Sequence, residues 1–406
     1  MDFTHSDRSL DFQRKVKRFI DEHLAAVDSD YQSWVHANNH ARFQHWQPPP
    51  YVAELKREAK EQGLWNLFLP DPELGQGLST TEYAPLAEAM GHCLLAPEVF
   101  NCNAPDSGNM EVLYHFGTPE QQQRWLKPLL AAEIRSVFCM TEPAVASSDA
   151  TNIEASIAVD GEDLVLNGRK WWTTGLGHPQ AEVAIFMGIS DADAPRHQRH
   201  SMVLVPLDTP GVKIERMLSV LGDYDPPYGH GEVVFNDVRV PKDHLICGLG
   251  QGFAIAQGRL GPGRIHHCMR AIGASERALS LMIERGSQRI AFGKPLLKLG
   301  GNADIVADLR MAIDQARLLT QYAAWRIDNG GARQAMKEIS AIKVVAPNVL
   351  EKVVDAAIQI FGAEGVSDQT PLASLLGMAR ALRLADGPDA VHRALVGRLE
   401  IKEQTQ

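Results

Sequence analysis

Two short segments carry side chains that suit a flat polar ligand. The first, from Phe138 to Ile153, is rich in small and polar residues, and its hydroxyl and backbone amide groups can hydrogen-bond such a ligand. The second, from Lys170 to Gly175, combines two indoles with two threonines. Because successive side chains of a strand alternate, we expect Trp171 and Trp172 on opposite faces, one in the core and the other able to cover an aromatic ligand.

A third segment, Leu384 to Asp389, is predicted to be a loop between two helices and contains two carboxylates. Asp389 is well placed to cap the N-terminus of the second helix. Asp386 has no such role, and it follows an apolar run and precedes a flexible Gly-Pro pair. We therefore regard Asp386 as a candidate general base.

Arg264 follows the sequence Gly261-Pro-Gly263, which predicts a tight loop that leads into a helix. In the first turn of a helix a cation is unfavourable against the helix dipole. Arg264 therefore either has a functional role or stands there by chance or for a salt bridge, and the sequence leaves these interpretations open.

Other motifs argue against several classes of site. Residues 248–253 resemble a dinucleotide-binding fingerprint, but they lack the third glycine at the required offset and no βαβ unit surrounds them. There is no Walker P-loop and no HExxH sequence. His266 and His267 are adjacent on a predicted helix and point in different directions, so we expect packing or local hydrogen bonds rather than a shared metal. The sequence predicts no metal site.

The composition sets further limits. A chain of 406 residues predicts two or three domains, and its net charge of −10 argues against a nucleic-acid-binding surface. The five cysteines include no CxxC pair and favour a reducing compartment. No signal peptide, peroxisomal tripeptide or run of about 18 apolar residues is recognisable, so we expect a cytoplasmic protein without a membrane span.

The periodicity changes twice along the chain. Residues 1–137 are predicted to be helical, with helices near 51–62 and 80–92 and a capping box at Thr118-Pro-Glu-Gln121. An irregular connection is expected over residues 28–50.

Residues 138–243 alternate with the period of strands, and turns are expected at Asp160-Gly161 and, as a hairpin, at Asn167-Gly168. Further strands are predicted at 181–189, 201–207 and 232–240. Residues 244–406 return to long apolar stripes at helical spacing. The predicted fold is α+β: an N-terminal helical domain, a middle β-barrel or sandwich, and a C-terminal four-helix bundle.

These features together resemble the acyl-CoA dehydrogenase family over nearly the whole chain. The segments that carry the resemblance are MTEP at 140–143, Trp171 to Gly175, GQGF at 250–253, RIAFG at 289–293, QIFG at 359–362 and the Asp386 loop. The runs at 261–267 and 385–389 are most similar to the subgroup typified by the family-11 member. The family fold agrees with the α-β-α order predicted above.

The resemblance implies a role for each matching residue. It implies Asp386 as the catalytic base, and Ser147, Arg264 and Gly387 as substrate-binding residues. It implies that FAD is held in part by a neighbouring subunit, in a homodimer or homotetramer. The cofactor-binding residues implied are Phe138, Met140, Thr141, Ser147, Ser148, Trp171, Trp172, Thr173, Thr174, Arg289, Phe292, Gln359, Gly362, Ala363, Pro388 and Asp389.

The sequence departs from the common family pattern at three places. Two serines, Ser147 and Ser148, precede Asp149 where one is usual, and Pro388 replaces the usual threonine. Asp386 stands where many members have glutamate, and its carboxylate reaches about 1.5 Å less far. Because a base must come within hydrogen-bonding reach of its proton, the loop or the substrate must lie correspondingly closer.

The function implied by the resemblance is α,β-dehydrogenation of an acyl-CoA thioester in fatty acid β-oxidation, with electrons passed to an electron-transferring flavoprotein. Two alternatives on the same fold are an acyl-CoA oxidase and a flavin monooxygenase. A non-enzymatic helical binding protein is the alternative from a different class. Flavin absorption and oxygen consumption would distinguish them.

Overall fold

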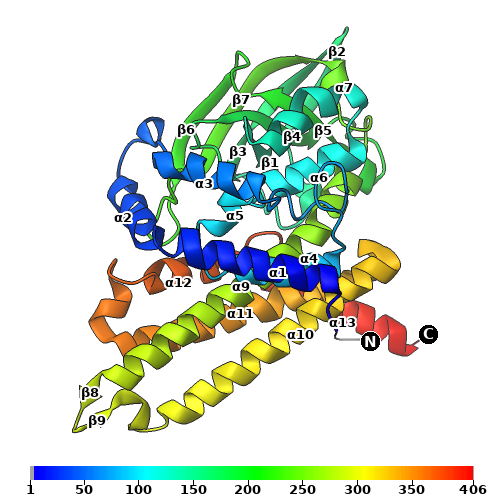
Figure 1. Cartoon of the computed structure of the whole chain (residues 1–406). Helices are drawn as coiled ribbons and strands as arrows, with labels where there is room; N and C mark the ends of the chain where they lie inside the picture. The colour runs from blue at the N-terminus through cyan, green and yellow to red at the C-terminus, as the bar shows by residue number, and fades with distance from the viewer. Residues whose placement is uncertain (1–3, 406) are drawn as a thin grey trace. The chain divides into compact units, whose positions relative to one another are not determined.

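The computed structural model describes residues 4–405, without the side chains of Leu260 and Pro262 (Figure 1). The chain divides into two compact units. The first comprises Met1–His36, Ala53–Phe100 and Gly261–Gln406, and the second comprises Ala37–Val52 and Asn101–Leu260.

Helices build the first unit. Its N-terminal segments supply α1 (Asp7–Phe19), most of α2 (Asp28–Asn38) and α3 (Pro50–Glu61), α4 (Thr80–Met90) and α5 (Ala96–Val99). Its C-terminal segment supplies α10 (Asn302–Gln334), α11 (Met336–Phe361), α12 (Leu372–Leu382), α13 (Asp389–Thr405) and most of α9 (Gly252–Gln288).

Apolar stripes at helical spacing explain how the long helices pack. Helix α11 contacts α10, α12 and α13, and it buries Ile342, Leu350 and Val353. Helix α10 buries Leu309 and Ile313. The predicted C-terminal helical bundle is confirmed.

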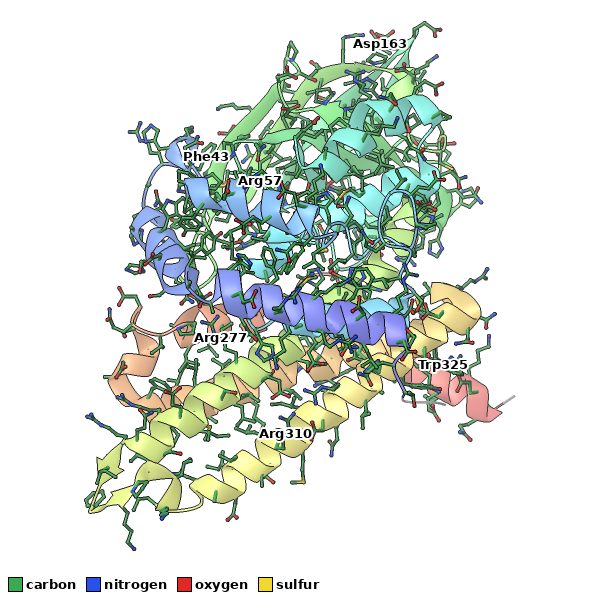
Figure 2. All side chains as sticks on the ribbon, viewed as in Figure 1. Phe43, Arg57, Asp163, Arg277, Arg310 and Trp325 are labelled. Atoms are coloured by element: carbon green, nitrogen blue, oxygen red, sulfur yellow. The ribbon has the colours of Figure 1, made fainter. Side chains whose placement is uncertain are left out.

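Ion pairs join α9 to its neighbours in this unit. Arg310 of α10 binds Glu276 of α9 at 2.7 Å, and Arg317 binds both Glu276 and Glu88 of α4. Arg277 of α9, which Figure 2 labels, pairs with Asp28 of α2. Helix α2 therefore has specific partners within a region predicted to be irregular, so that prediction was wrong over residues 28–38.

A seven-stranded sheet dominates the second unit. Its strands are β1 (Arg135–Cys139), β2 (Ser156–Asp160), β3 (Asp163–Thr174), β4 (Ala181–Ile189), β5 (His200–Pro206), β6 (Val212–Leu218) and β7 (His230–Pro241). Their order is β1-β4-β2-β3-β7-β6, with β5 paired to β4. Helices α6 (Asp106–Phe116), α7 (Pro119–Gln121) and α8 (Lys127–Ala131) precede the sheet, and the Thr118–Gln121 capping box is present as predicted.

Two details of the sheet differ from the prediction. The hairpin lies at residues 160–163, and β3 runs straight through Asn167 and Gly168. Asn167 instead bonds to Asp237 of β7. Gly168 permits a close approach, because a Cβ atom there would lie 2.5 Å from the Cβ atom of Ala155. Strands β1 and β6 were not predicted.

Candidate active site

A buried ion pair fixes the loop that follows β1. The Lys170 ammonium group, which is fully buried in β3, donates hydrogen bonds to the Glu142 carboxylate (2.7 Å), the Met140 carbonyl (3.1 Å) and the Met187 carbonyl (2.7 Å). The Glu142 carboxylate also accepts hydrogen bonds from the backbone N–H groups of residues 154–155. Burial lowers the pKa of Lys170, and the adjacent Glu142 opposes this shift. The MTEP segment is therefore anchored by its own glutamate.

The hydroxyl groups of this loop differ in their availability. The Glu142 N–H group donates to Ser147 Oγ at 2.9 Å, so the Ser147 hydroxyl stabilises the turn. Ser148 is exposed. The Thr141 carbonyl accepts a hydrogen bond from the Trp171 N–H group at 3.0 Å, which brings the loop next to the second predicted segment.

The two tryptophans lie at a β-bulge. The pairing of β3 with β7 shifts register between Lys170 and Thr173, and Trp172 adopts a left-handed conformation (φ 52°). The indole rings are tilted, with centroids 6.2 Å apart, so the predicted separation onto opposite faces was wrong. The bulge interrupts the alternation on which that prediction rested. Trp171 is half-buried and Trp172 is 41% exposed, so neither belongs to the core.

Phe138 of β1 has a cationic neighbour. The Arg259 guanidinium lies 4.1 Å from the centroid of the Phe138 ring, and its Nε donates to Asn109 Oδ1 at 3.1 Å. At the far end of β3, Thr173 is buried and Thr174 Oγ1 lies 3.0 Å from His230 Nδ1. Arg259 was not among the residues predicted from the sequence. The available signal was a lone basic residue in the apolar first turns of α9.

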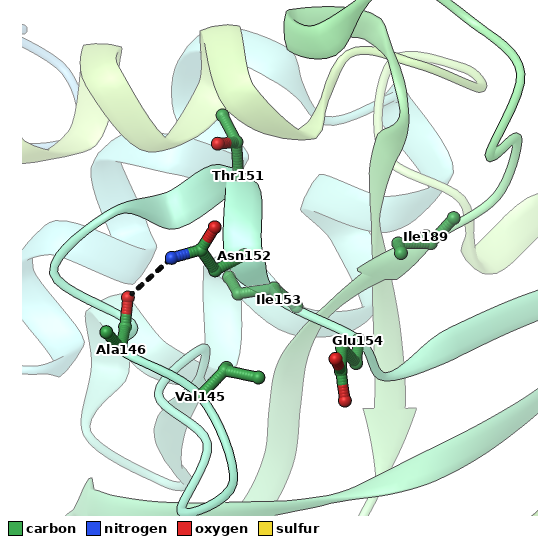
Figure 3. Close-up of a pocket in the computed structure, with 7 residues that line it drawn as sticks. All are labelled: Val145, Ala146, Thr151, Asn152, Ile153, Glu154 and Ile189. Carbon is green, nitrogen blue, oxygen red and sulfur yellow. Dashed lines mark hydrogen bonds between the residues drawn. The ribbon is translucent and has the colours of Figure 1, made fainter.

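An open hollow of about 380 Å³ adjoins the same loop (Figure 3). Asn152 closes one side of it by donating a hydrogen bond to the Ala146 carbonyl at 3.3 Å. The lining residues are Val145, Ala146, Thr151, Asn152, Ile153, Glu154 and Ile189.

In the first unit, the Asp386 loop is held by its backbone. Asp386 is left-handed (φ 54°). Its carbonyl oxygen accepts hydrogen bonds from Arg264 Nε (3.2 Å) and Nη2 (2.9 Å), and His392 Nε2 lies 3.1 Å from the same oxygen. The Asp386 carboxylate lies 3.6 Å from His267 Nε2. A carboxylate with a fixed backbone can act as a positioned base.

Arg264 is placed differently from the prediction. Helix α9 continues through Gly261-Pro-Gly263, so Arg264 lies in the helix interior and not in a first turn. The guanidinium is buried and donates hydrogen bonds to the Asp386 carbonyl, which is 122 residues away along the chain. His266 and His267 point apart as predicted, since His266 packs against Tyr83 while His267 faces Asp386.

Asp389 does not act as the predicted cap. It is the first residue of α13, and its Oδ2 accepts hydrogen bonds from Asn348 (3.0 Å) and Arg383 (2.9 Å). The Arg383 guanidinium also binds Glu351 of α11. This ion pair ties Pro388 and the start of α13 to the helical unit.

Three segments of the chain match models of known protein domains. Residues 6–133, 137–238 and 250–400 match, respectively, the N-terminal, middle and C-terminal domains of acyl-CoA dehydrogenase. The chain is 51% identical to the probable acyl-CoA dehydrogenase FadE2 of Mycobacterium tuberculosis over 100% of this chain and 98% of that protein. The chain belongs to the acyl-CoA dehydrogenase family.

Two further relatives and two solved structures resemble the chain. The chain is 49% identical to human acyl-CoA dehydrogenase family member 11, covering 100% of this chain and 52% of that protein. It spans 37% of mouse family member 10. A solved structure of a putative acyl-CoA dehydrogenase from Mycobacterium abscessus has 55% identity, a TM-score of 0.96 and coverage of 99% and 100% of the two chains. A glutaryl-CoA dehydrogenase of Mycobacterium smegmatis, solved with FADH2, shares the fold at 21% identity (TM-score 0.80, 97% and 94% coverage).

The other predicted cofactor-binding residues lie in two segments at one end of the C-terminal bundle. Arg289 and Phe292 belong to the hairpin of β8 (Ile290–Ala291) and β9 (Lys294–Pro295), whose tip leaves Phe292 96% exposed. Gln359, Gly362 and Ala363 lie at the end of α11. Arg285, in the last turn of α9 before the hairpin, contacts the end of α11, because its guanidinium lies 5.2 Å from the Phe361 ring centroid and binds Glu364 at 2.6 Å.

Among residues 4–405, no three potential metal ligands come together. No helix in that range is long and apolar enough to cross a membrane.

Proposed function

We propose that the protein is an FAD-dependent acyl-CoA dehydrogenase that converts an acyl-CoA thioester into the trans-2-enoyl-CoA. The observation that supports this most directly is the Asp386 loop, in which a single carboxylate follows α12 and its backbone is held by Arg264 and His392. The proposal includes the roles predicted for the site residues. It also includes a division of the chain into three domains at residues 1–137, 138–243 and 244–406.

The residues around Trp171 fit a flavin ring. The Trp171 Nε1 atom is buried without a hydrogen-bond acceptor among the described residues, so a donor is available for a ligand. The Trp172 ring lies beside the Trp171 ring, and the Trp171 backbone N–H group bonds to the Thr141 carbonyl, so this donor adjoins an indole and the anchored Met140-Thr141 segment. Indole and hydroxyl groups suit a flat heteroaromatic ring. When bound, FAD would supply the acceptor for the hydrogen on the β-carbon. The solved glutaryl-CoA dehydrogenase with FADH2 is consistent with this choice of cofactor.

Asp386 would remove the proton from the α-carbon of the thioester. Hydrogen bonds to the thioester carbonyl would acidify that proton, and the fixed backbone of Asp386 would bring the carboxylate within reach. Arg264, Gly387 and Ser147 are the proposed substrate-binding residues. The Arg264 side chain also supports the base, because its donors reach the Asp386 carbonyl.

We propose a homodimer or homotetramer in which a neighbouring subunit contributes Arg289, Phe292, Gln359, Gly362 and Ala363 to the adenine half of FAD. The nearly complete exposure of Phe292 supports an interface at the hairpin. Helix α10 also presents Met311, Leu318 and Trp325 to solvent, seven residues apart along one face (Figure 2 labels Trp325). A repeat of seven on a long helix is typical of helix–helix contacts.

An electron-transferring flavoprotein is the proposed electron acceptor, and fatty acid β-oxidation the proposed setting. An acyl-CoA oxidase or flavin monooxygenase would consume oxygen with substrate and need no protein acceptor. A non-enzymatic helical binding protein would be colourless when purified. A panel of acyl-CoA thioesters, assayed by flavin reduction, would identify the preferred acyl chain.

The Asp386→Asn variant tests the base. The purified variant should keep yellow FAD, because an amide of the same size preserves the loop, but acyl-CoA should reduce the flavin about 10²- to 10⁴-fold more slowly. The measurement is stopped-flow bleaching of the flavin absorption in the wild type and the variant. Bleaching at the wild-type rate would show that Asp386 is not the base.

A further inference from the structure

Side chains from three different helices hold the backbone of the segment that contains Asp386. Lys343 of α11 donates to the Leu382 carbonyl at the end of α12. Arg264 of α9 and His392 of α13 both contact the Asp386 carbonyl. A lysine at the C-terminus of a helix also interacts favourably with the helix dipole. The loop is therefore restrained at both of these carbonyl groups.

His392 has a defined protonation state in this arrangement. Its side chain is buried, and this burial, reinforced by the positive charge of Arg264, lowers its pKa to about 4. The ring is therefore neutral near pH 7. Because Nε2 lies 3.1 Å from a carbonyl oxygen, Nε2 must carry the hydrogen and donate it. The Nδ1 atom then has a lone pair, and it has no hydrogen-bond partner among the described residues.

The His392 hydrogen bond bears on the orientation of the Asp386 peptide as well as on the stability of the fold. The left-handed conformation of Asp386 is sparsely populated by residues other than glycine, and it persists only where the surrounding contacts enforce it. Arg264 and His392 approach one oxygen from two helices, so together they fix the direction of this peptide as well as its position. The ring of His392 also packs on Gly387, where a Cβ atom would lie 2.8 Å from Nε2.

We propose that His392 is a positioning residue for the base, and that it sets the peptide of Asp386 so that the shorter carboxylate reaches the α-carbon of the substrate. This inference rests on the proposed function. An aspartate has one methylene fewer than a glutamate with which to adjust its reach, so its carboxylate depends more closely on the backbone that carries it. His392 therefore acts through Asp386 and does not itself touch the substrate.

The test compares His392→Leu, which removes the donor, with His392→Gln, whose side-chain amide can replace it. His266→Leu is the matched control, since it removes another buried imidazole of the same unit that packs on Tyr83 and not on Asp386. Each FAD-loaded protein is assayed for flavin reduction by acyl-CoA, for the kinetic isotope effect of deuterium at the α-carbon, and for hydrogen exchange of the amides of residues 384–387.

His392→Leu should bind acyl-CoA with nearly unchanged affinity and reduce flavin up to about 100-fold more slowly, with a larger isotope effect and faster amide exchange in the loop. His392→Gln should recover most of the rate, and His266→Leu should keep the rate and the isotope effect. Equal losses in the Leu and Gln variants, or a normal rate in His392→Leu, would overturn the proposal.

Two further outcomes have distinct meanings. If His392→Leu does not fold, the shorter amide of His392→Asn takes its place, and wild-type exchange and rate in that variant would refute the role. If wild-type protein binds FAD but no acyl-CoA bleaches it, the proposed function fails. In that case, unchanged loop exchange in His392→Leu would independently reject the positioning of Asp386.

Discussion

Glu111 shows, at the scale of one residue, how burial sets a protonation state. Burial raises the pKa of this α6 carboxyl group to about 8, although Arg259 opposes the shift. In the unfolded chain the group titrates near 4.5. Between these values the native state keeps a proton that the unfolded state has lost, so the free energy of unfolding falls as pH rises, by at most about 1.4 kcal/mol per pH unit. Glu111→Gln should therefore gain stability relative to wild type from pH 5 to pH 8.

Urea denaturation at several pH values measures this difference. Glu162→Gln is the matched control, because that carboxylate lies in an exposed turn, and its difference from wild type should stay nearly constant with pH. A pH-independent difference for Glu111→Gln would mean that Glu111 is ionised in the native protein.

At the scale of secondary structure elements, the sequence predicted what depends on local periodicity. The long helices α9 to α11 follow from apolar stripes, and the β2–β3 turn follows from Asp160-Gly161. The errors lie where a distant contact overrides a local signal. Asn167-Gly168 resembles a hairpin turn, but Asp237 and Ala155 keep this pair within a strand.

The candidate site shows the same division. The sequence motifs predicted the Met140 and Asp386 segments as candidates, but the register shift that brings the Trp171 and Trp172 rings close together depends on pairing with β7. Two further features were not predicted: α9 continues through Gly261-Pro-Gly263, and Arg264 donates to the Asp386 carbonyl. This carbonyl is 122 residues away along the chain, so the hydrogen bond is non-local. Spacing along one sequence contains no information about such partners.

The anchoring of the MTEP loop by β3 gives a prediction at this scale. Lys170→Met removes one partner of a buried ion pair and leaves the Glu142 carboxylate uncompensated, so unfolding should become easier by about 3–5 kcal/mol. Because the same loop is proposed to line the flavin, the variant should also bind FAD more weakly. The matched control is Arg239→Met, which breaks the exposed pair with Asp160 and should change neither property noticeably. Denaturation and FAD titration measure the two effects. Full FAD affinity in Lys170→Met would show that FAD binding does not depend on the Lys170–Glu142 ion pair.

At the scale of the whole molecule, the proposed sharing of FAD between subunits couples assembly to cofactor binding. Phe292 is exposed at the tip of the β8–β9 hairpin, so Phe292→Asp would place a charge in the proposed interface with little effect on the fold of one subunit. A ligand that binds only the assembled protein stabilises the assembly by mass action. On dilution, wild-type protein should therefore lose FAD and dissociate over the same concentration range, and Phe292→Asp should do both at higher protein concentration.

Analytical ultracentrifugation at the flavin wavelength follows both events, and Leu221→Asp, at another exposed apolar residue, is the control. A Phe292→Asp monomer that retains FAD with wild-type affinity would show that one subunit holds the whole cofactor.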